Sequence, residues 1–123
     1  MNTYPVRRRT FQMTEVPTNH EPVWALLQSS LAKKYSYSPE RPKPTQAGSS
    51  IDFPTTTCSF EELLQTLEET YTPASKYSIG RPEHLLSDFV QYQLFNHEQT
   101  YVLQAVETPQ EYHILLRTQA AQS

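Results

Sequence analysis

Residues 80–95, GRPEHLLSDFVQYQLF, form the stretch on which the predicted fold depends. Pro82 suits the first turn of a helix, where its missing N–H costs nothing, and Glu83 suits the positive end of the helix dipole. Six large apolar residues recur at helical spacing and would form one wide stripe: Leu85, Leu86, Phe89, Val90, Leu94 and Phe95. The pattern predicts that the central core helix of the protein lies in this stretch.

Two more helices are predicted on the N-terminal side. Residues 58–71, CSFEELLQTLEETY, place Ser59 and Glu62 at the spacing of a capping box, and leucines follow at helical spacing. Residues 18–37, TNHEPVWALLQSSLAKKYSY, begin with polar residues suited to capping and a proline, and they end with two lysines suited to the negative end of the dipole. Both stretches therefore combine helical periodicity with start or stop signals.

The C-terminal part of the chain has a different pattern. Residues 100–119, TYVLQAVETPQEYHILLRTQ, contain two short runs of β-branched, aromatic and aliphatic residues on either side of a turn sequence. They predict an antiparallel β-hairpin with strands over 101–106 and 112–116. Because two strands alone are marginal in water, the hairpin must pack on the helices or gain a third strand. Residues 4–13 are one source of that strand, although Arg7 to Arg9 would leave both of its faces charged.

A length of 123 residues allows one modest core. We therefore expect a small single α+β domain over residues 18–118, with about three helices and a C-terminal antiparallel β-hairpin. Residues 36–57, SYSPERPKPTQAGSSIDFPTTT, are rich in Pro and Ser and predict a long loop after the first helix. Residues 1–17 predict a basic, extended N-terminal arm, and residues 119–123 predict a frayed tail.

The composition argues against several classes of function. With only two glycines, the chain lacks the glycine-rich loops that bind nucleotide phosphates, and we expect no cofactor. His84 and Asp88 would share one face of the predicted helix, but two ligands at this spacing are common by chance, so no metal site is predicted. The single cysteine, Cys58, cannot form an intrachain disulfide, and no apolar run is long enough to span a membrane. These features predict a cytoplasmic protein without a membrane partner.

The charge is unevenly distributed along the chain. The net charge is -3, but residues 1–50 carry seven Lys and Arg against three Glu, whereas residues 51–123 carry three against ten acidic residues. Such a chain can dock its halves on each other or present opposite charges to two partners. The eight tyrosines lie mostly near the ends of the predicted elements, which favours packing at the rim of the core over use in an interface.

The leading functional hypothesis is a non-enzymatic protein-binding module, such as an adaptor, an assembly factor or an inhibitor. It would use the acidic amphipathic helix, exposed aromatic residues and the basic arm. The predicted partner-binding residues are Arg7, Arg8, Arg9, Phe11, Phe53, Glu61, Glu62, Glu68, Glu69 and Tyr71.

Two other classes of function stay open. A nucleic-acid-associated regulator would contact phosphates through the three N-terminal arginines, helped by Lys33 and Lys34. A small enzyme would use Cys58 as a nucleophile or the paired glutamates as acid and base. An unpaired edge of the hairpin could also be completed by a second copy of the chain, which makes a homodimer conceivable.

Overall fold

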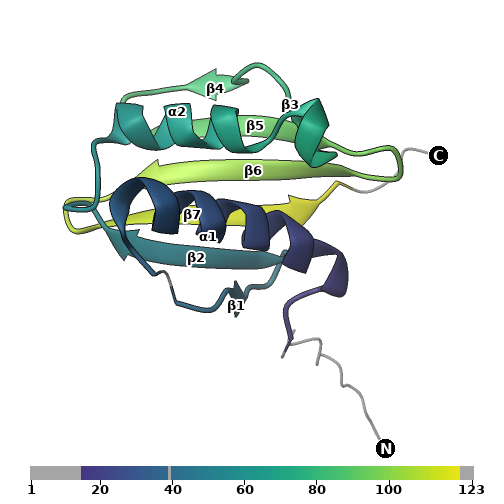
Figure 1. The fold of residues 1–123 in the computed structure, drawn as a ribbon, viewed down its shortest axis with the longest axis horizontal. Helices are drawn as coiled ribbons and strands as arrows, with labels where there is room; N and C mark the ends of the chain where they lie inside the picture. Colours follow the sequence, from purple (N-terminus) through teal and green to yellow (C-terminus); the bar gives the residue numbers. More distant parts are fainter. Residues whose placement is uncertain (1–14, 39, 120–123) are drawn as a thin grey trace, which may run out of the picture.

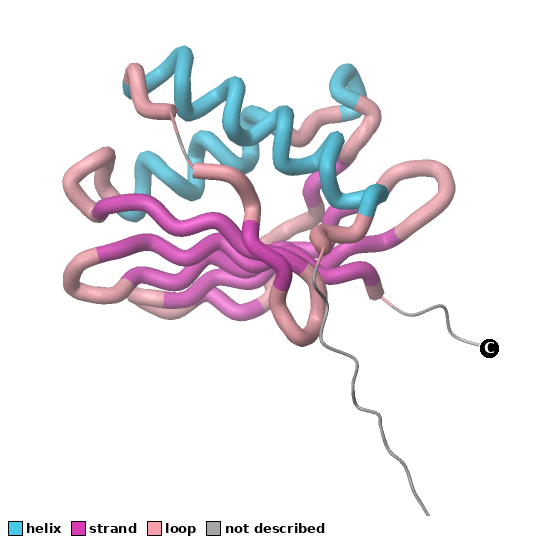
Figure 2. Tube along the Cα trace, turned by 90° about the horizontal axis from the view of Figure 1, so that it is seen from below, coloured by secondary structure: helices cyan, strands magenta, loops and turns pink. Residues whose placement is uncertain are grey.

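The computed structural model describes residues 15–38 and 40–119. Within them, two helices lie on one face of a seven-stranded antiparallel sheet (Figure 1). Figure 2 shows both helices on the same side of the strands, and no helix of the described residues covers the other side. The architecture is therefore a two-layer α/β sandwich with one open sheet face.

The two N-terminal helix predictions are confirmed. Helix α1, Glu21–Tyr35, follows the short 3-10 helix η2, Thr18–His20, and has a proline in its first turn. Helix α2, Phe60–Thr70, begins with the capping box: the Glu62 backbone N–H donates to Ser59 Oγ at 3.1 Å, and the Ser59 N–H donates to Glu62 Oε1 at 2.9 Å. The expected capping of α1 by Thr18 or Asn19 is wrong, because both residues belong to η2 and the N-cap of α1 is His20, which makes no side-chain cap hydrogen bond.

The sheet has the order β1-β2-β7-β6-β5-β3, and β4 also pairs with β5. Its strands are β1 Lys43–Pro44, β2 Ser49–Pro54, β3 Ser78–Ile79, β4 His84–Leu85, β5 Phe89–Phe95, β6 Thr100–Glu107 and β7 Glu111–Thr118. A second 3-10 helix, η3 Pro73–Ser75, lies between α2 and β3. Every neighbouring pair is antiparallel.

The predicted third helix is wrong, and with it the expected architecture of three helices and a hairpin. Residues 80–95 instead contain β4, a turn and β5. In β5 the side chains alternate, so that Val90, Tyr92 and Leu94 are buried while their neighbours lie on the open face. A cluster of apolar residues fits either period, and here pairing with β6 along all seven residues of β5 favours the strand. Pro82 lies at the outer edge of the sheet, where a missing N–H does not interrupt a ladder.

The predicted long loop over 36–57 also needs correction, because it contains β1 and β2. Strand β2 pairs with β7 over six residues and buries Ile51 and Phe53 under the helices. The predicted hairpin is present as β6 and β7, but it lies in the middle of the sheet, between β5 and β2. The proposed third strand over 4–13 falls outside the described residues.

The core is formed between the two helices and the covered face of the sheet. Trp24 and Leu27 from α1, and Leu63 and Leu67 from α2, are at most 1% exposed. Four tyrosines are also at most 2% exposed and therefore belong to the core rather than to its rim: Tyr71, Tyr92, Tyr101 and Tyr112. Their hydroxyl groups find partners, as in the bond from Tyr112 Oη to the Cys58 carbonyl at 2.6 Å, which is the usual condition for burying tyrosine.

Both outer edges of the sheet carry residues that disfavour strand pairing between molecules. Strand β1 follows Pro42 and contains Lys43 and Pro44, and Pro82 lies between two charged residues beside β4. Proline and charge on an edge strand are common ways to prevent such pairing. The central position of the hairpin also removes the unpaired hairpin edge that motivated a homodimer, which itself stays a prediction.

Candidate functional site

Two of the four predicted glutamates of α2 lie on the side that faces α1. Glu69 Oε1 accepts from Lys34 Nζ at 2.8 Å, and this hydrogen bond lowers the pKa of the Glu69 carboxyl. The hydrogen bonds that Glu62 makes with Ser59 in the capping box likewise lower its pKa. Both carboxylates are exposed to solvent, but each has a structural role. Glu69 links α2 to α1 through Lys34, and Glu62 completes the capping box at the start of α2.

The other two glutamates lie on the opposite side of α2. Glu61, Leu64 and Glu68 are spaced at i, i+3 and i+7, which places them along one side of the helix. The Tyr92 hydroxyl, from β5 beneath, donates to Glu68 Oε2 at 2.9 Å. Since α1 occupies the other flank of α2, this side faces the β4 edge of the sheet (Figure 1).

The segment over 81–88, which contains β4, is exposed at every residue. Its two leucines are among the few large apolar side chains that stay in water: Leu85 is 66% exposed and Leu86 is 62% exposed. Leu85 pairs with Val90, so it lies on the helix-covered side of the sheet, beyond the flank of α2. Leu86 begins a tight turn in which its N–H donates to the Phe89 carbonyl at 2.8 Å.

Four exposed carboxylates belong to the two segments at this edge of the sheet, and one of them, Glu83, accepts from Gln91 Nε2 at 3.1 Å. Glu61 and Glu68 come from α2, and Glu83 and Asp88 flank the leucines in sequence. We define the β4 edge surface as Glu61, Leu64, Glu68, Glu83, Leu85, Leu86 and Asp88. It combines exposed apolar side chains with negative charge.

The remaining predicted partner-binding residues lie elsewhere. Phe53 and Tyr71 are each 1% exposed and belong to the core, so the expectation that they offer aromatic contacts at the surface is corrected. Phe53 is buried because β2 lies under the helices, and the Tyr71 hydroxyl donates to the Val23 carbonyl at 2.7 Å. Arg7, Arg8, Arg9 and Phe11 fall outside the described residues.

The groups considered for catalysis are poorly placed for it. Cys58 is 8% exposed, and burial raises the pKa of its thiol, which disfavours the reactive thiolate. Burial lowers the pKa of His20, whose Nδ1 lies 2.8 Å from Ser49 Oγ. This serine–histidine pair is inaccessible, because both residues are at most 1% exposed. His84 and Asp88 do not share a helix face, because β4 and a turn replace the predicted helix.

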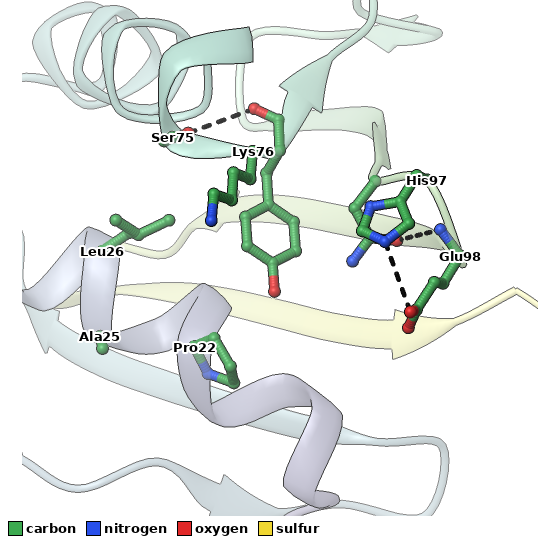
Figure 3. Close-up of a pocket in the computed structure, with 9 residues that line it drawn as sticks. Pro22, Ala25, Leu26, Ser75, Lys76, His97 and Glu98 are labelled. Carbon is green, nitrogen blue, oxygen red and sulfur yellow. Dashed lines mark hydrogen bonds and ion pairs between the residues drawn. The ribbon is translucent and has the colours of Figure 1, made fainter.

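An apolar groove of about 570 Å³ opens between the start of α1, η3 and the β5–β6 turn (Figure 3). Pro22, Ala25 and Leu26 form one wall, while Lys76 and His97 lie across from them. His97 Nε2 lies 3.4 Å from a Glu98 carboxylate oxygen, so part of its polar rim is already paired. The groove has the volume of a ligand pocket, but its open form would leave much of a small ligand in water.

The open sheet face has a more polar character. Glutamines line its centre, and Gln104 Nε2 donates to Gln91 Oε1 at 2.7 Å. At the start of β7, His113 and Glu111 lie within 4.8 Å of each other and of Asp52, measured between ligand atoms.

The β4 edge surface could not be found from the sequence, because both of its exposed leucines were assigned to the stripe of a core helix.

None of the described helices is long and apolar enough to cross a membrane. No family model matches the chain, and no curated protein or solved structure is significantly similar to it.

Proposed function

We propose that this protein is a non-enzymatic binding module and that its partner is another protein, which docks on the β4 edge surface. The observation that carries the proposal is the exposure of Leu85 and Leu86, at 66% and 62%, on one short segment. Burying a leucine side chain stabilises a complex by about 1.5–3 kcal/mol. Burial of these two exposed leucines by a partner can therefore contribute to the affinity of a complex.

The charges around the leucines define the chemistry of the partner. Glu61, Glu68, Glu83 and Asp88 give the β4 edge surface four carboxylates, and Arg81 is the one arginine or lysine in the 81–88 segment, which also contains His84. A partner segment with apolar side chains flanked by Lys or Arg would match both properties. The charges would steer the encounter and set its salt dependence, while the leucines would supply most of the affinity.

The two halves of the acidic helix thus have different roles in this proposal. Glu62 and Glu69 are engaged with Ser59 and Lys34, so replacing them would affect the protein's own stability. Glu61 and Glu68 lie toward the β4 edge, where a bound segment could reach their exposed carboxylates, and Glu68 Oε2 also accepts from the Tyr92 hydroxyl. The burial of Cys58, which raises the pKa of its thiol, supports a binding role over a nucleophilic one. A reduced, buried cysteine also agrees with the cytoplasmic location that we propose.

Affinity capture from extract of the source cells tests the proposal when three baits are compared: wild type, L85S/L86S and F95S. Phe95 is a matched control, because it is also a large exposed side chain, 39% exposed, but lies at the far end of β5 on the open face. We expect one stoichiometric protein that is retained by wild type and F95S and lost with L85S/L86S. A protein that L85S/L86S retains as well as wild type would show that docking occurs elsewhere.

Nuclease treatment of half of each extract separates this proposal from the nucleic-acid alternative. Arg7 to Arg9, on which that alternative depends, lie outside the described residues, and Lys34 is paired with Glu69. Retention that survives nuclease supports the protein-binding proposal. Retention that disappears with nuclease would favour a regulator that contacts phosphates.

A further inference from the structure

On the open face of the sheet, three potential metal ligands converge at the boundary between β2 and β7. Asp52 and His113 are directly opposite each other in the β2–β7 register, and Glu111 precedes His113 by two residues on the same face. One ligand atom from each residue lies within 4.8 Å of the other two. We propose that these three side chains form a binding site for a first-row transition-metal dication of the Zn²⁺ type.

The sheet holds the ligands in place without any contribution from a loop. Strands β2 and β7 pair over six residues, so the two sides of the site cannot drift apart. Directly opposite residues of an antiparallel pair have Cβ atoms roughly 5 Å apart. A ligand shell around zinc needs donor atoms about 3.4 Å apart, as follows from zinc–ligand distances of about 2.1 Å. His113 Nδ1 and Asp52 Oδ1 lie 2.7 Å apart and all three ligand atoms lie within 4.8 Å, so side-chain rotations would have to widen the first separation to reach this spacing.

The donor set indicates the class of ion. An imidazole with two carboxylates matches the ligands that zinc and neighbouring transition ions take in proteins, whereas magnesium and calcium prefer oxygen ligands alone. His113 Nδ1 and Asp52 Oδ1 already lie 2.7 Å apart in a hydrogen bond, which an ion bound to both atoms would replace. Three protein ligands would leave at least one position for water or for a group from another molecule.

The site is accessible to ions from solvent. The side chains of His113 and Asp52 are 34% and 26% exposed, and Glu111 is exposed. Lys43 Nζ lies 3.8 Å from Asp52 Oδ2, where its positive charge opposes a cation. Replacing Lys43 by an uncharged residue should therefore strengthen metal binding. If Asp52 and His113 formed only a cross-strand ion pair, this replacement would have no metal affinity to change.

The test uses the full chain without an affinity tag, stripped of metal by a chelator. Zn²⁺ binding is measured by calorimetry, and Co²⁺ binding by the visible absorption that reports its coordination. We expect one ion per chain, loss of binding in H113A, and affinity at least about tenfold weaker in D52N and E111Q, since even outer partners of metal ligands contribute 10–100-fold. K43A should bind a few-fold more tightly than wild type.

His97→Ala is the matched control, because His97 is 82% exposed and lies in the β5–β6 turn. It should bind like wild type. Absence of saturable binding up to millimolar metal would overturn the proposal. Equal weakening by H97A and H113A would also overturn it, as would binding that E111Q leaves unchanged. Because Glu111 is exposed, E111Q keeps the proposal testable even if H113A folds poorly.

Discussion

The substitution Ser49→Ala tests whether the buried polar network under α1 holds the helix to the sheet. Ser49 Oγ accepts from Trp24 Nε1 at 2.7 Å and is hydrogen-bonded to His20 Nδ1 at 2.8 Å. His20 Nε2 is hydrogen-bonded to Thr118 Oγ1 at 2.8 Å. One hydroxyl thus connects β2, α1 and the 3-10 helix η2.

Removing this hydroxyl leaves a buried indole N–H and a buried imidazole nitrogen without partners. Each unsatisfied group costs about 1–3 kcal/mol, so S49A should lower the free energy of unfolding by about 2–6 kcal/mol. For a domain of this size, that corresponds to a fall in Tm of roughly 8 °C or more.

Urea unfolding followed by tryptophan fluorescence and by circular dichroism measures this loss. Ser50→Ala is the matched control, because Ser50 is the next residue of β2 and is partly exposed on the open face. It should change the free energy of unfolding by less than about 0.5 kcal/mol. If S49A and S50A unfold at the same urea concentration with equal slopes, the assignment of the network as a stabilising element is wrong.

Three other predictions concern stability and reactivity. Burial lowers the pKa of His20 in the folded protein, so the unfolded chain binds the proton first and the free energy of unfolding should fall as the pH drops below the ordinary value of 6.5. In urea titrations between pH 8 and pH 5, the free energy of unfolding of H20Q should depend less on pH than that of the wild type. Ser59→Ala removes the capping box of α2 and should cost about 1 kcal/mol in the same unfolding assay, against little for Thr56→Ala in the preceding turn. The Cys58 thiol should react slowly with a thiol reagent in the native protein and rapidly in urea, and equal rates would contradict its burial.

The two helices could be predicted because their signals are local. The capping box at Ser59 and the proline in the first turn of α1 act within a few residues, so their effect does not depend on the rest of the fold. The β6–β7 hairpin could also be predicted from its turn and its two apolar runs. Its place at the centre of a sheet could not, because that depends on pairing with β2 and β5.

Strand β5 was missed because its apolar residues fit two periods at once. Val90, Tyr92 and Leu94 alternate as in a strand, but Leu85, Leu86 and Phe89 extend the same residues into a helical stripe. The choice is made by non-local pairing with β6. Strand β2 was missed for a similar reason: four prolines between 39 and 54 indicate a loop, and the alternation in 49–53 is short.

In the candidate site, too, some residues could be identified from local sequence signals and others only from strand pairing. Glu61 and Glu68 were predicted as binding residues from helix amphipathicity, and they do lie on the exposed side of α2 that faces β4. Leu85 and Leu86 were placed in the core by hydrophobicity alone, and only the register with β5 shows that they protrude. The Asp52–His113 pair likewise needs the β2–β7 register, because the two residues are far apart in sequence.

The most direct test of the central claim is photo-crosslinking in the source cells, with a photoreactive residue placed at position 86 or, in a second strain, at position 95. Position 86 lies in the β4 edge surface, and position 95 lies at the opposite end of β5. The account predicts a crosslink to one protein from position 86 that is absent from position 95. A crosslink of equal yield from both positions, or one from position 95 alone, would contradict it.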